Sequence, residues 1–345
     1  MLFQLNRSQR DVFSLWHTWR RVVQPLFLTI AAFFVVASVF SFREGLPRIL
    51  PLNSLLDHTA TPRTPDEPLA PLRIRLVHAL DKVPTYPNQR NLFQSFRQRP
   101  TPPSPGETNS LWEGWKSWEK LNPDWTRHFI DDHHMEHHVL LLASAGVPEV
   151  LSTYRSLPTM VLRSDFMRYV LVFMYGGVWA DIDTLAHLSI AEWYRRCLGG
   201  SGSHRGSVGF IAGTELDFDP IDKSASWLDR TLYFAQFMFM ARRGHPILLE
   251  VLADVIEVTP TTPPNRNVLI WTGPRRWTDN IVGHLYGNYP GLTQRNITYL
   301  DKPMMLGDVC LLPVSGFGAG RDQANSPPVT DPDVFAHHFF QFSWG

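Results

Sequence analysis

The chain has 345 residues, 44% apolar and 19% charged, so it is long enough to bury a sizeable core in one large or two small domains. Its 32 basic and 32 acidic residues give a formal net charge of zero, which argues against bulk electrostatic attraction to nucleic acid. The two cysteines, Cys197 and Cys310, exclude a disulfide framework, and whether they pair in an oxidising compartment is left open by the sequence.

The N-terminal part of the chain is predicted to anchor the protein in a membrane. Residues 25–42 form a charge-free apolar run near the short end of the length that a membrane-spanning helix needs. Four arginines precede this run, so the positive-inside rule places residues 1–24 in the cytosol and the rest in the lumen, as a single-pass type II protein. A short span fits thin early-secretory membranes. A cleaved signal peptide is the alternative interpretation.

A stem and a large domain are expected after the anchor. Residues 43–71 are rich in Pro and Thr and lack an apolar period, as an extended linker does. The segment 72–80 alternates well enough to be the first strand of a domain that spans residues 72–345. Ser110 with Glu113 predicts a capped helix, and residues 126–130 predict a second strand.

A histidine-rich segment follows that second strand. The order H-x-x-E-H from His133 to His137 is that of an inverted zinc-protease motif, with His134, Glu136 and His138 beside it. The alternative interpretation is a solvated first turn of a helix. We favour the helix start over a zinc site.

The stretch from residue 163 to 183 begins as a buried helix. Ser164 is predicted to cap this helix, and Asp165 and Arg168 then share one face of its first turn. Gly176 and Gly177 are predicted to end it, because the left-handed backbone of a helix cap is most accessible to glycine.

A short strand at residues 178–180 is predicted to run into Asp181 and Asp183. Period-two alternation places both carboxylates on one side and sends Ile182 toward the core. Paired carboxylates are hard oxygen ligands suited to Mg²⁺ or Mn²⁺, and such a metal can hold a diphosphate leaving group.

The next segments are predicted as a strand at 208–213, an acidic loop at 215–222 and an apolar helix at 227–240. Gly244 is expected to end that helix and Pro246 to open the following one.

A strand at 268–271 is predicted to reach a turn and then another helix. Ligands of α/β sheets bind beyond the carboxyl ends of strands, so Asp279 is a candidate ligand contact. Its alternative role is a charge near a helix N-terminus. Asn296 begins a sequon that the predicted topology places in the lumen.

Several of these motifs together resemble those of one enzyme family. The S-D-x-x-R helix, the Gly-Gly turn and the D-x-D pair resemble the donor site of glycosyltransferases with a DXD sugar-nucleotide region, specifically family 32, which includes fungal Golgi initiation-specific α-1,6-mannosyltransferases. The segments 118–125, 272–279 and 337–345 are similar to further motifs of that family. Two features depart from it: only Val77 and His78 match its first-strand motif, and Phe342 stands where glycine is usual.

The resemblance implies a GT-A-like α/β domain with a mostly parallel, doubly wound sheet flanked by helices. Asp183 would ligate Mn²⁺ or Mg²⁺, and Asp181 would bind the metal or the donor ribose. His338 would be a third metal ligand, with His337 as the alternative. The resemblance implies donor contacts from Asp165, Arg168, Asp181, Asp183, Gly273, Ser343 and Trp344; no residue identifies a dedicated nucleophile, and Asp279 is the candidate catalytic group.

The implied activity is retaining transfer of α-mannose from GDP-mannose to an N-glycan in the Golgi lumen. The expected partners are that donor, a glycan acceptor, the Golgi membrane and other Golgi transferases, without nucleic acid. Within the same family, mannosylation of inositol phosphoceramide or use of a UDP-sugar is an alternative. A catalytically silent lumenal partner of an active relative is the alternative from another class.

Overall fold

The computed structural model describes residues 71–86, 90–199, 207–218, 231–321 and 326–341, all within one compact unit. The predicted cytosolic tail, membrane anchor and nearly all of the stem lie outside these residues, as do Ser343 and Trp344. The domain boundaries therefore stay predictions. Among the helices that the structure describes, none has the length and apolar character to cross a membrane.

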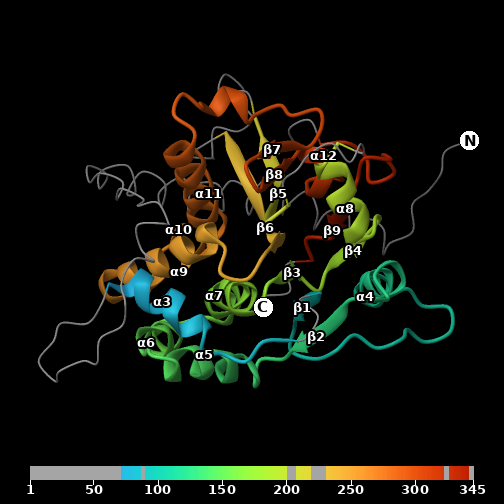
Figure 1. The fold of residues 1–345 in the computed structure, drawn as a ribbon. Helices are drawn as coiled ribbons and strands as arrows, with labels where there is room; N and C mark the ends of the chain where they lie inside the picture. The colour runs from blue at the N-terminus through green and yellow to red at the C-terminus, as the bar shows by residue number, and fades with distance from the viewer. Residues whose placement is uncertain (1–70, 87–89, 200–206, 219–230, 322–325, 342–345) are drawn as a thin grey trace, which may run out of the picture. The chain divides into compact units, whose positions relative to one another are not determined.

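A seven-stranded sheet forms the centre of the fold (Figure 1). In spatial order its strands are β2 (Thr126–Ile130), β1 (Asn91–Ser95), β3 (Gly177–Ala180), β6 (Leu232–Ala241), β5 (Phe210–Asp217), β8 (Val309–Leu312) and β7 (Met304–Leu306). The pairings give β2, β1, β3, β5 and β8 one direction, and β6 and β7 the opposite one. The predicted α/β class with a mostly parallel sheet is confirmed.

Helices cover both faces of this sheet, because side chains of successive strand residues point to opposite faces. In β3, Trp179 belongs to the core on one face, whereas Val178 and Ala180 belong to the core on the other. The first core is covered by α3 (Leu72–Leu80), α5 (Met135–Ser144), α6 (Glu149–Ser156), α7 (Met160–Tyr175), α9 (Pro246–Val258), α10 (Val268–Trp271) and α11 (Pro274–Asn288). The second is covered by α4 (Ser110–Leu121), α8 (Ile190–Cys197) and α12 (Val314–Phe317).

A disulfide joins Cys197, at the end of α8, to Cys310 in β8. The two cysteines are 113 residues apart in sequence, so the bond ties a covering helix to the central sheet and closes a long loop. The pairing that the sequence leaves open is thus present in the fold.

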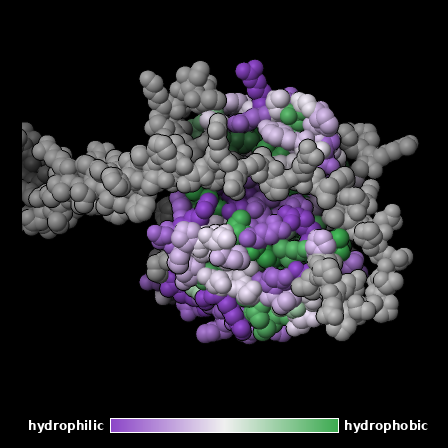
Figure 2. All heavy atoms as spheres, turned by 90° about the vertical axis from the view of Figure 1, so that its left-hand side faces the viewer, coloured by the Kyte–Doolittle hydropathy of each residue, from purple (hydrophilic) through white to green (hydrophobic). Residues whose placement is uncertain are grey.

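The prediction of a strand at residues 72–80 is wrong, because this segment is helix α3. Leu76, Ala79 and Leu80 are buried on one helical face. Arg73, three residues before Leu76, lies at the edge of that face and pairs with Glu250 on α9, with 2.7 Å between Nε and Oε2. Only residues 72–76 alternate between apolar and charged, and five residues are too few to distinguish the period of a strand from that of a helix. Figure 2 views the side on which α3 lies, and hydrophilic residues predominate among its coloured parts.

The predicted helix at 227–240 is also wrong, because its described part belongs to strand β6. Every residue of Leu232–Ala241 is buried, since the strand lies inside the sheet with helices on both faces. A continuous apolar run has the same pattern in a buried helix and in a buried strand, so periodicity could not decide between them.

The predicted strand at 268–271 is instead the one-turn helix α10. The Asn267 side chain caps it by accepting a hydrogen bond from the Leu269 N–H, at 2.9 Å. The predicted helix after it is confirmed as α11. Strand β5 begins at Phe210 and continues to Asp217, so it includes the start of the predicted acidic loop.

Candidate metal and donor site

Helix α7 begins earlier than predicted, and this changes where its polar residues lie. The helix starts at Met160 after Thr159, so Ser164 is a buried residue inside the helix and not its cap. Asp165 and Arg168 consequently lie in the second and third turns. Their side chains are buried, in a helix whose other residues pack into the core.

The Gly176–Gly177 turn after α7 is confirmed, and it needs glycine at both positions. Their φ angles are +67° and +123°, a region that other residues rarely adopt. A Cβ on Gly177 would lie 2.2 Å from the backbone oxygen of Asn91 in β1. The close approach lets β3 start directly beside β1 and end immediately before Asp181.

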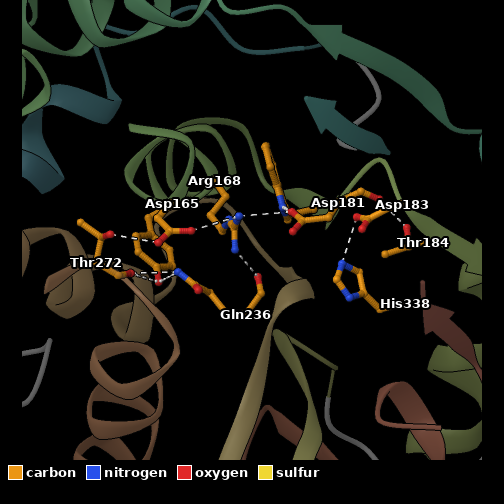
Figure 3. Close-up of polar contacts among 10 residues, drawn as sticks. Asp165, Arg168, Asp181, Asp183, Thr184, Gln236, Thr272 and His338 are labelled. Atoms are coloured by element: carbon orange, nitrogen blue, oxygen red, sulfur yellow. Dashed lines mark hydrogen bonds and ion pairs between the residues drawn. The ribbon is translucent and has the colours of Figure 1, made fainter. Parts of the chain in front are cut away.

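Arg168 joins two carboxylates that come from different elements. Its Nη2 lies 3.1 Å from Asp165 Oδ1 and 3.3 Å from Asp181 Oδ1, and its Nη1 donates to the Gln236 carbonyl in β6 at 3.2 Å. Trp179 Nε1 donates to the same Asp181 oxygen at 2.6 Å. Figure 3 shows these side chains in one row from Thr272 to His338.

Asp165 is held at the other end of this row by the residue that follows α10. The Thr272 hydroxyl donates to Asp165 Oδ2 at 2.9 Å, and the Thr272 carbonyl accepts from Tyr169 and from the Gln236 amide. Gly273 is buried beside it, and a Cβ there would lie 2.7 Å from the Val268 carbonyl oxygen. The predicted Thr-Gly-Pro turn therefore contributes to this site although the element before it is helical.

A second, two-stranded sheet brings His338 to Asp183. Strand β4 (Thr184–Ala186) pairs antiparallel with β9 (Ala336–His338), with Thr184 opposite His338. The backbone N–H of Phe339 donates to the Asp183 carbonyl at 2.8 Å, and the Gln341 N–H donates to Asp183 Oδ2 at 3.1 Å. His338 Nε2 then lies 2.9 Å from Asp183 Oδ1.

Asp181, Asp183 and His338 each offer a ligand atom within 4.8 Å of the others, and they are the one such group of three among the described residues. In the part of the chain that the structure describes, neither ring nitrogen of His338 has a hydrogen-bond partner although both are buried, because Nε2 is close to Asp183 without hydrogen-bond geometry. Two carboxylate oxygens and a neutral imidazole suit Mn²⁺ or Mg²⁺. The residues present therefore fit a divalent cation.

Burial and neighbouring charges shift the pKa values of Asp165, Asp181 and Asp183 in different directions. Burial raises the pKa of Asp165 to about 6, although Arg168 and the Thr272 hydroxyl oppose it. Burial also raises the pKa of Asp181, with Asp183 adding to it and Arg168 opposing it. For Asp183 burial is outweighed by His338 and by the Gln341 N–H, so its pKa is lowered. Asp183 is thus the carboxylate best kept ionised for a cation.

Other predicted site residues lie elsewhere. Asp279 is on α11, half-buried, with Oδ2 3.9 Å from Arg275 Nε, and it is not a member of the metal-ligand group. His337, the alternative to His338, instead places Nδ1 2.7 Å from His187 Nε2.

The histidine-rich segment is a helix start, as we favoured. Asp131 Oδ1 accepts from the backbone N–H groups of His133 and His134, and α5 begins at Met135. His133 and His137 are exposed, whereas His138 is buried against the Tyr175 hydroxyl at 3.2 Å from Nδ1. The H-x-x-E-H order does not assemble a metal-ligand group in the described residues.

Gln94 is a candidate donor contact that the sequence interpretation missed. It is fully buried in β1, one residue beyond the pair Phe93–Trp179, and so lies at the sheet edge where Asp181 follows β3. Within the described ranges, neither its amide nitrogen nor its amide oxygen has a hydrogen-bond partner. The apolar residues Leu92 and Phe93 could have been taken as a short strand. That prediction would have placed Gln94 near the carboxyl end of the strand.

Comparison with known proteins assigns the same region to a glycosyltransferase family. Residues 109–197 match the model of the glycosyltransferase sugar-binding region containing a DXD motif. This match contains α7, the Gly-Gly turn, Asp181 and Asp183, whereas His338 lies outside it.

Curated relatives extend the similarity beyond that region. The initiation-specific α-1,6-mannosyltransferase of Schizosaccharomyces pombe is 31% identical over 240 residues, which cover 66% of this chain and 58% of the relative. The Candida albicans protein of the same name is 27% identical over 282 residues, covering 68% and 71%. The inositol phosphoceramide mannosyltransferase 3 of Schizosaccharomyces pombe is 23% identical, covering 52% and 46%.

The chain therefore spans a little over half of the first relative's length. Among solved structures, the PaToxG glycosyltransferase aligns with 65% of this chain at 15% identity and a TM-score of 0.39, which is too low to carry an argument about fold. The resemblance predicted from the D-x-D stretch is confirmed by sequence: the chain carries a DXD-containing glycosyltransferase sugar-binding region and is related to the fungal initiation-specific α-1,6-mannosyltransferases.

Proposed function

We propose that this protein is a metal-dependent, retaining glycosyltransferase of the GT-A type that moves α-mannose from GDP-mannose to an N-glycan mannose. The main support for this proposal is the candidate metal-ligand group. Asp181 and Asp183, both buried, and the partly buried His338 form a group at the carboxyl end of a sheet strand, and the two carboxylates lie in the matched DXD region. The mannosyltransferase names of the relatives support the choice of sugar.

The chemistry needs negative charge to be stabilised on a diphosphate leaving group, and a divalent cation supplies this when bound. Asp183 and His338 would hold it directly, with Asp181 as the third ligand. Arg168 fixes the orientation of Asp181 through its 3.3 Å contact and neutralises part of the buried charge. Asp165 is buried, with Oδ1 beside Arg168 and Oδ2 accepting from Thr272, so its role in this proposal is to hold the Arg168 guanidinium beside Asp181.

The proposed location is the Golgi lumen, with the chain anchored by residues 25–42. The charge asymmetry around that run supports this topology. The Cys197–Cys310 disulfide supports it as well, since such bonds persist in oxidising compartments and are rare in the cytosol. Asn296 is an exposed sequon, and attachment of a glycan to it would report lumenal exposure. A complex with other Golgi transferases is part of the same proposal.

Transfer to inositol phosphoceramide is the second candidate activity, because one relative carries that name. Use of a UDP-sugar is the related alternative for the donor. A catalytically silent partner role is disfavoured by the intact Asp181, Asp183 and His338 group, since an inactive subunit has no need to keep it.

The test uses the full-length chain in detergent. Hydrolysis and transfer are measured with GDP-mannose, UDP-galactose and UDP-N-acetylglucosamine, each with Mn²⁺ and with EDTA. We expect turnover of GDP-mannose alone, lost with EDTA and restored by Mn²⁺. An α-mannosyl oligosaccharide and inositol phosphoceramide then compete as acceptors. Binding of GDP-mannose without turnover on either acceptor would favour the silent partner, and EDTA-insensitive turnover would contradict the metal site.

A further inference from the structure

The imidazole of His338 lacks the contact that usually orients a metal-binding histidine. Such a histidine normally donates its second ring N–H to a carboxylate, a carbonyl or water, which fixes the ring. In the described part of the chain His338 Nδ1 is buried and makes no hydrogen bond. Besides the 2.9 Å contact of Nε2 with Asp183, the ring orientation therefore depends on packing.

Two aromatic rings provide that packing. Phe237 of β6 stacks on His338, with ring centroids 4.4 Å apart and an interplanar angle of 17°. Phe340 meets His338 edge-on, at 4.1 Å and 87°. Phe237 lies inside a sheet strand and is fixed by it. Phe340 lies two residues beyond His338, the last residue of β9, so its position depends on what holds the chain after the strand.

The backbone at Phe340 is in the left-handed region, with a φ of +50°. This conformation is unfavourable for a bulky side chain and persists only where the surroundings hold it. On either side of Phe340, the N–H groups of Phe339 and Gln341 donate to Asp183. These two bonds turn the chain so that the Phe340 ring packs against His338.

Arg321 lies over the Phe340 ring. Its Cζ is 4.2 Å from the ring centroid, so the planar guanidinium packs against the ring, as in a cation–π contact. Its Nη1 donates to Glu215 Oε1 in β5, and both side chains of this ion pair are largely buried. Phe340 thus contacts both the Arg321 guanidinium and the His338 imidazole.

We propose that Arg321, anchored to Glu215, clamps Phe340 against His338 and so positions His338 as a metal ligand. This inference rests on the proposed metal-dependent function. Arg321 and Phe340 are positioning residues: they set the orientation of the imidazole without touching the cation. Removing the clamp lowers the affinity for the cation through His338 and leaves Asp181 and Asp183 in place.

The experiment measures the Mn²⁺ dissociation constant of the full-length protein in detergent, from the electron paramagnetic resonance signal of free Mn²⁺ and without donor. The variants are Arg321→Met, Arg321→Lys, Phe340→Ala and Phe340→Gly, the last of which also relieves the positive φ. Arg163→Met is the matched control, because Arg163 also lies over a ring, that of Tyr154 at 5.5 Å, but not in the metal-ligand group. Each variant is checked by thermal unfolding.

We expect Arg321→Met and Phe340→Ala to weaken Mn²⁺ binding by about tenfold, as loss of an orienting partner does. Lys keeps the charge without the flat stacking group, so Arg321→Lys should recover only part of the affinity, and Arg163→Met should change nothing. The decisive measurement repeats Arg321→Met in a His338→Ala background, where no further weakening is expected.

The clamp is wrong if Arg321→Met leaves the affinity unchanged, or if it weakens binding by the same factor with and without His338. The His338→Ala variant alone tests the metal assignment on which the clamp depends. If His338→Ala itself leaves Mn²⁺ binding intact, then His338 is not a ligand, and both the metal assignment and the clamp are overturned.

Discussion

Two histidine-containing regions of this molecule offer metal-ligand chemistry, and their environments differ. The segment from His133 to His138 groups four histidines and a glutamate within six residues, but its charged groups already have partners: Glu136 pairs with Arg155, and His134 pairs with Asp131. The group of Asp181, Asp183 and His338 joins residues more than 150 positions apart. Its two carboxylates are buried, His338 Nε2 lies 2.9 Å from Asp183 Oδ1, and the buried Nδ1 has no hydrogen-bond partner in the described structure.

The difference shows that density of ligand types along a sequence is a poor guide to a metal site. Exposed groups at a helix start satisfy one another and water at little cost. A buried imidazole without a hydrogen bond is costly, so its retention needs another reason.

The largest effect is expected for Asp183→Asn. This change keeps the size of the side chain but removes the charge that a cation requires, so we expect transfer to fall by roughly 100- to 1,000-fold while the protein stays folded. The measurement is turnover of GDP-mannose at saturating Mn²⁺. Asp132→Asn, in the exposed helix start, is the matched control and should leave turnover unchanged. Comparable losses in both variants would remove the distinction between the regions.

Replacing the histidines should separate the regions by metal affinity. His338→Ala removes a ligand and is expected to weaken Mn²⁺ binding by at least about tenfold. The double variant His133→Ala with His137→Ala should change neither Mn²⁺ nor zinc content, because both side chains are exposed. Metal analysis of the purified protein checks this. Stoichiometric zinc in the native chain that disappears in the double variant would restore the zinc-protease interpretation.

The buried carboxylate row should also make stability depend on pH. The pKa of Asp165 is raised from 3.8 to about 6, so the folded state holds this proton more tightly than the unfolded chain does. Ionisation therefore costs folding free energy, and the free energy of unfolding should fall by about 2 kcal/mol from pH ~4.5 to pH ~7 through this group. Denaturant titration of Asp165→Asn should lose this component. An unchanged pH dependence in that variant would contradict the raised pKa.

The smallest effect is expected for Tyr175→Phe. This change removes the hydroxyl that lies 3.2 Å from His138 Nδ1 and leaves that buried nitrogen without its partner. The free energy of unfolding should fall by about 1 kcal/mol, with Mn²⁺ affinity unchanged. Denaturant titration and metal titration of the same sample test both. A loss of Mn²⁺ affinity here would mean that the histidine-rich helix contributes to the metal site.

Local patterns in the sequence were sufficient where a segment has one dominant signal. The Gly176–Gly177 turn, the strand before Asp181 and helices α9 and α11 are all readable from glycine, proline and spacing. The local patterns gave the wrong element for α3, α10 and β6, because a short or uniformly apolar segment fits both the helical and the strand period. In those segments packing decides the conformation: β6 lies inside the sheet, α3 packs against α9, and α10 packs against α11 and α7.

The sequence by itself determined that Asp181 and Asp183 follow a buried strand at the end of a helix–glycine–strand unit, because those residues are neighbours in the chain and local backbone geometry positions them. Only the tertiary structure decided the rest of the site. The pairing of β4 with β9 brings His338 to Asp183, and the inner position of β6 brings Phe237 against His338. Strand β1 places Gln94, which has no hydrogen-bond partner among the described residues, next to the end of β3. Contacts between residues far apart in the chain depend on which strands pair, and strand pairing is set by the packing of the whole sheet.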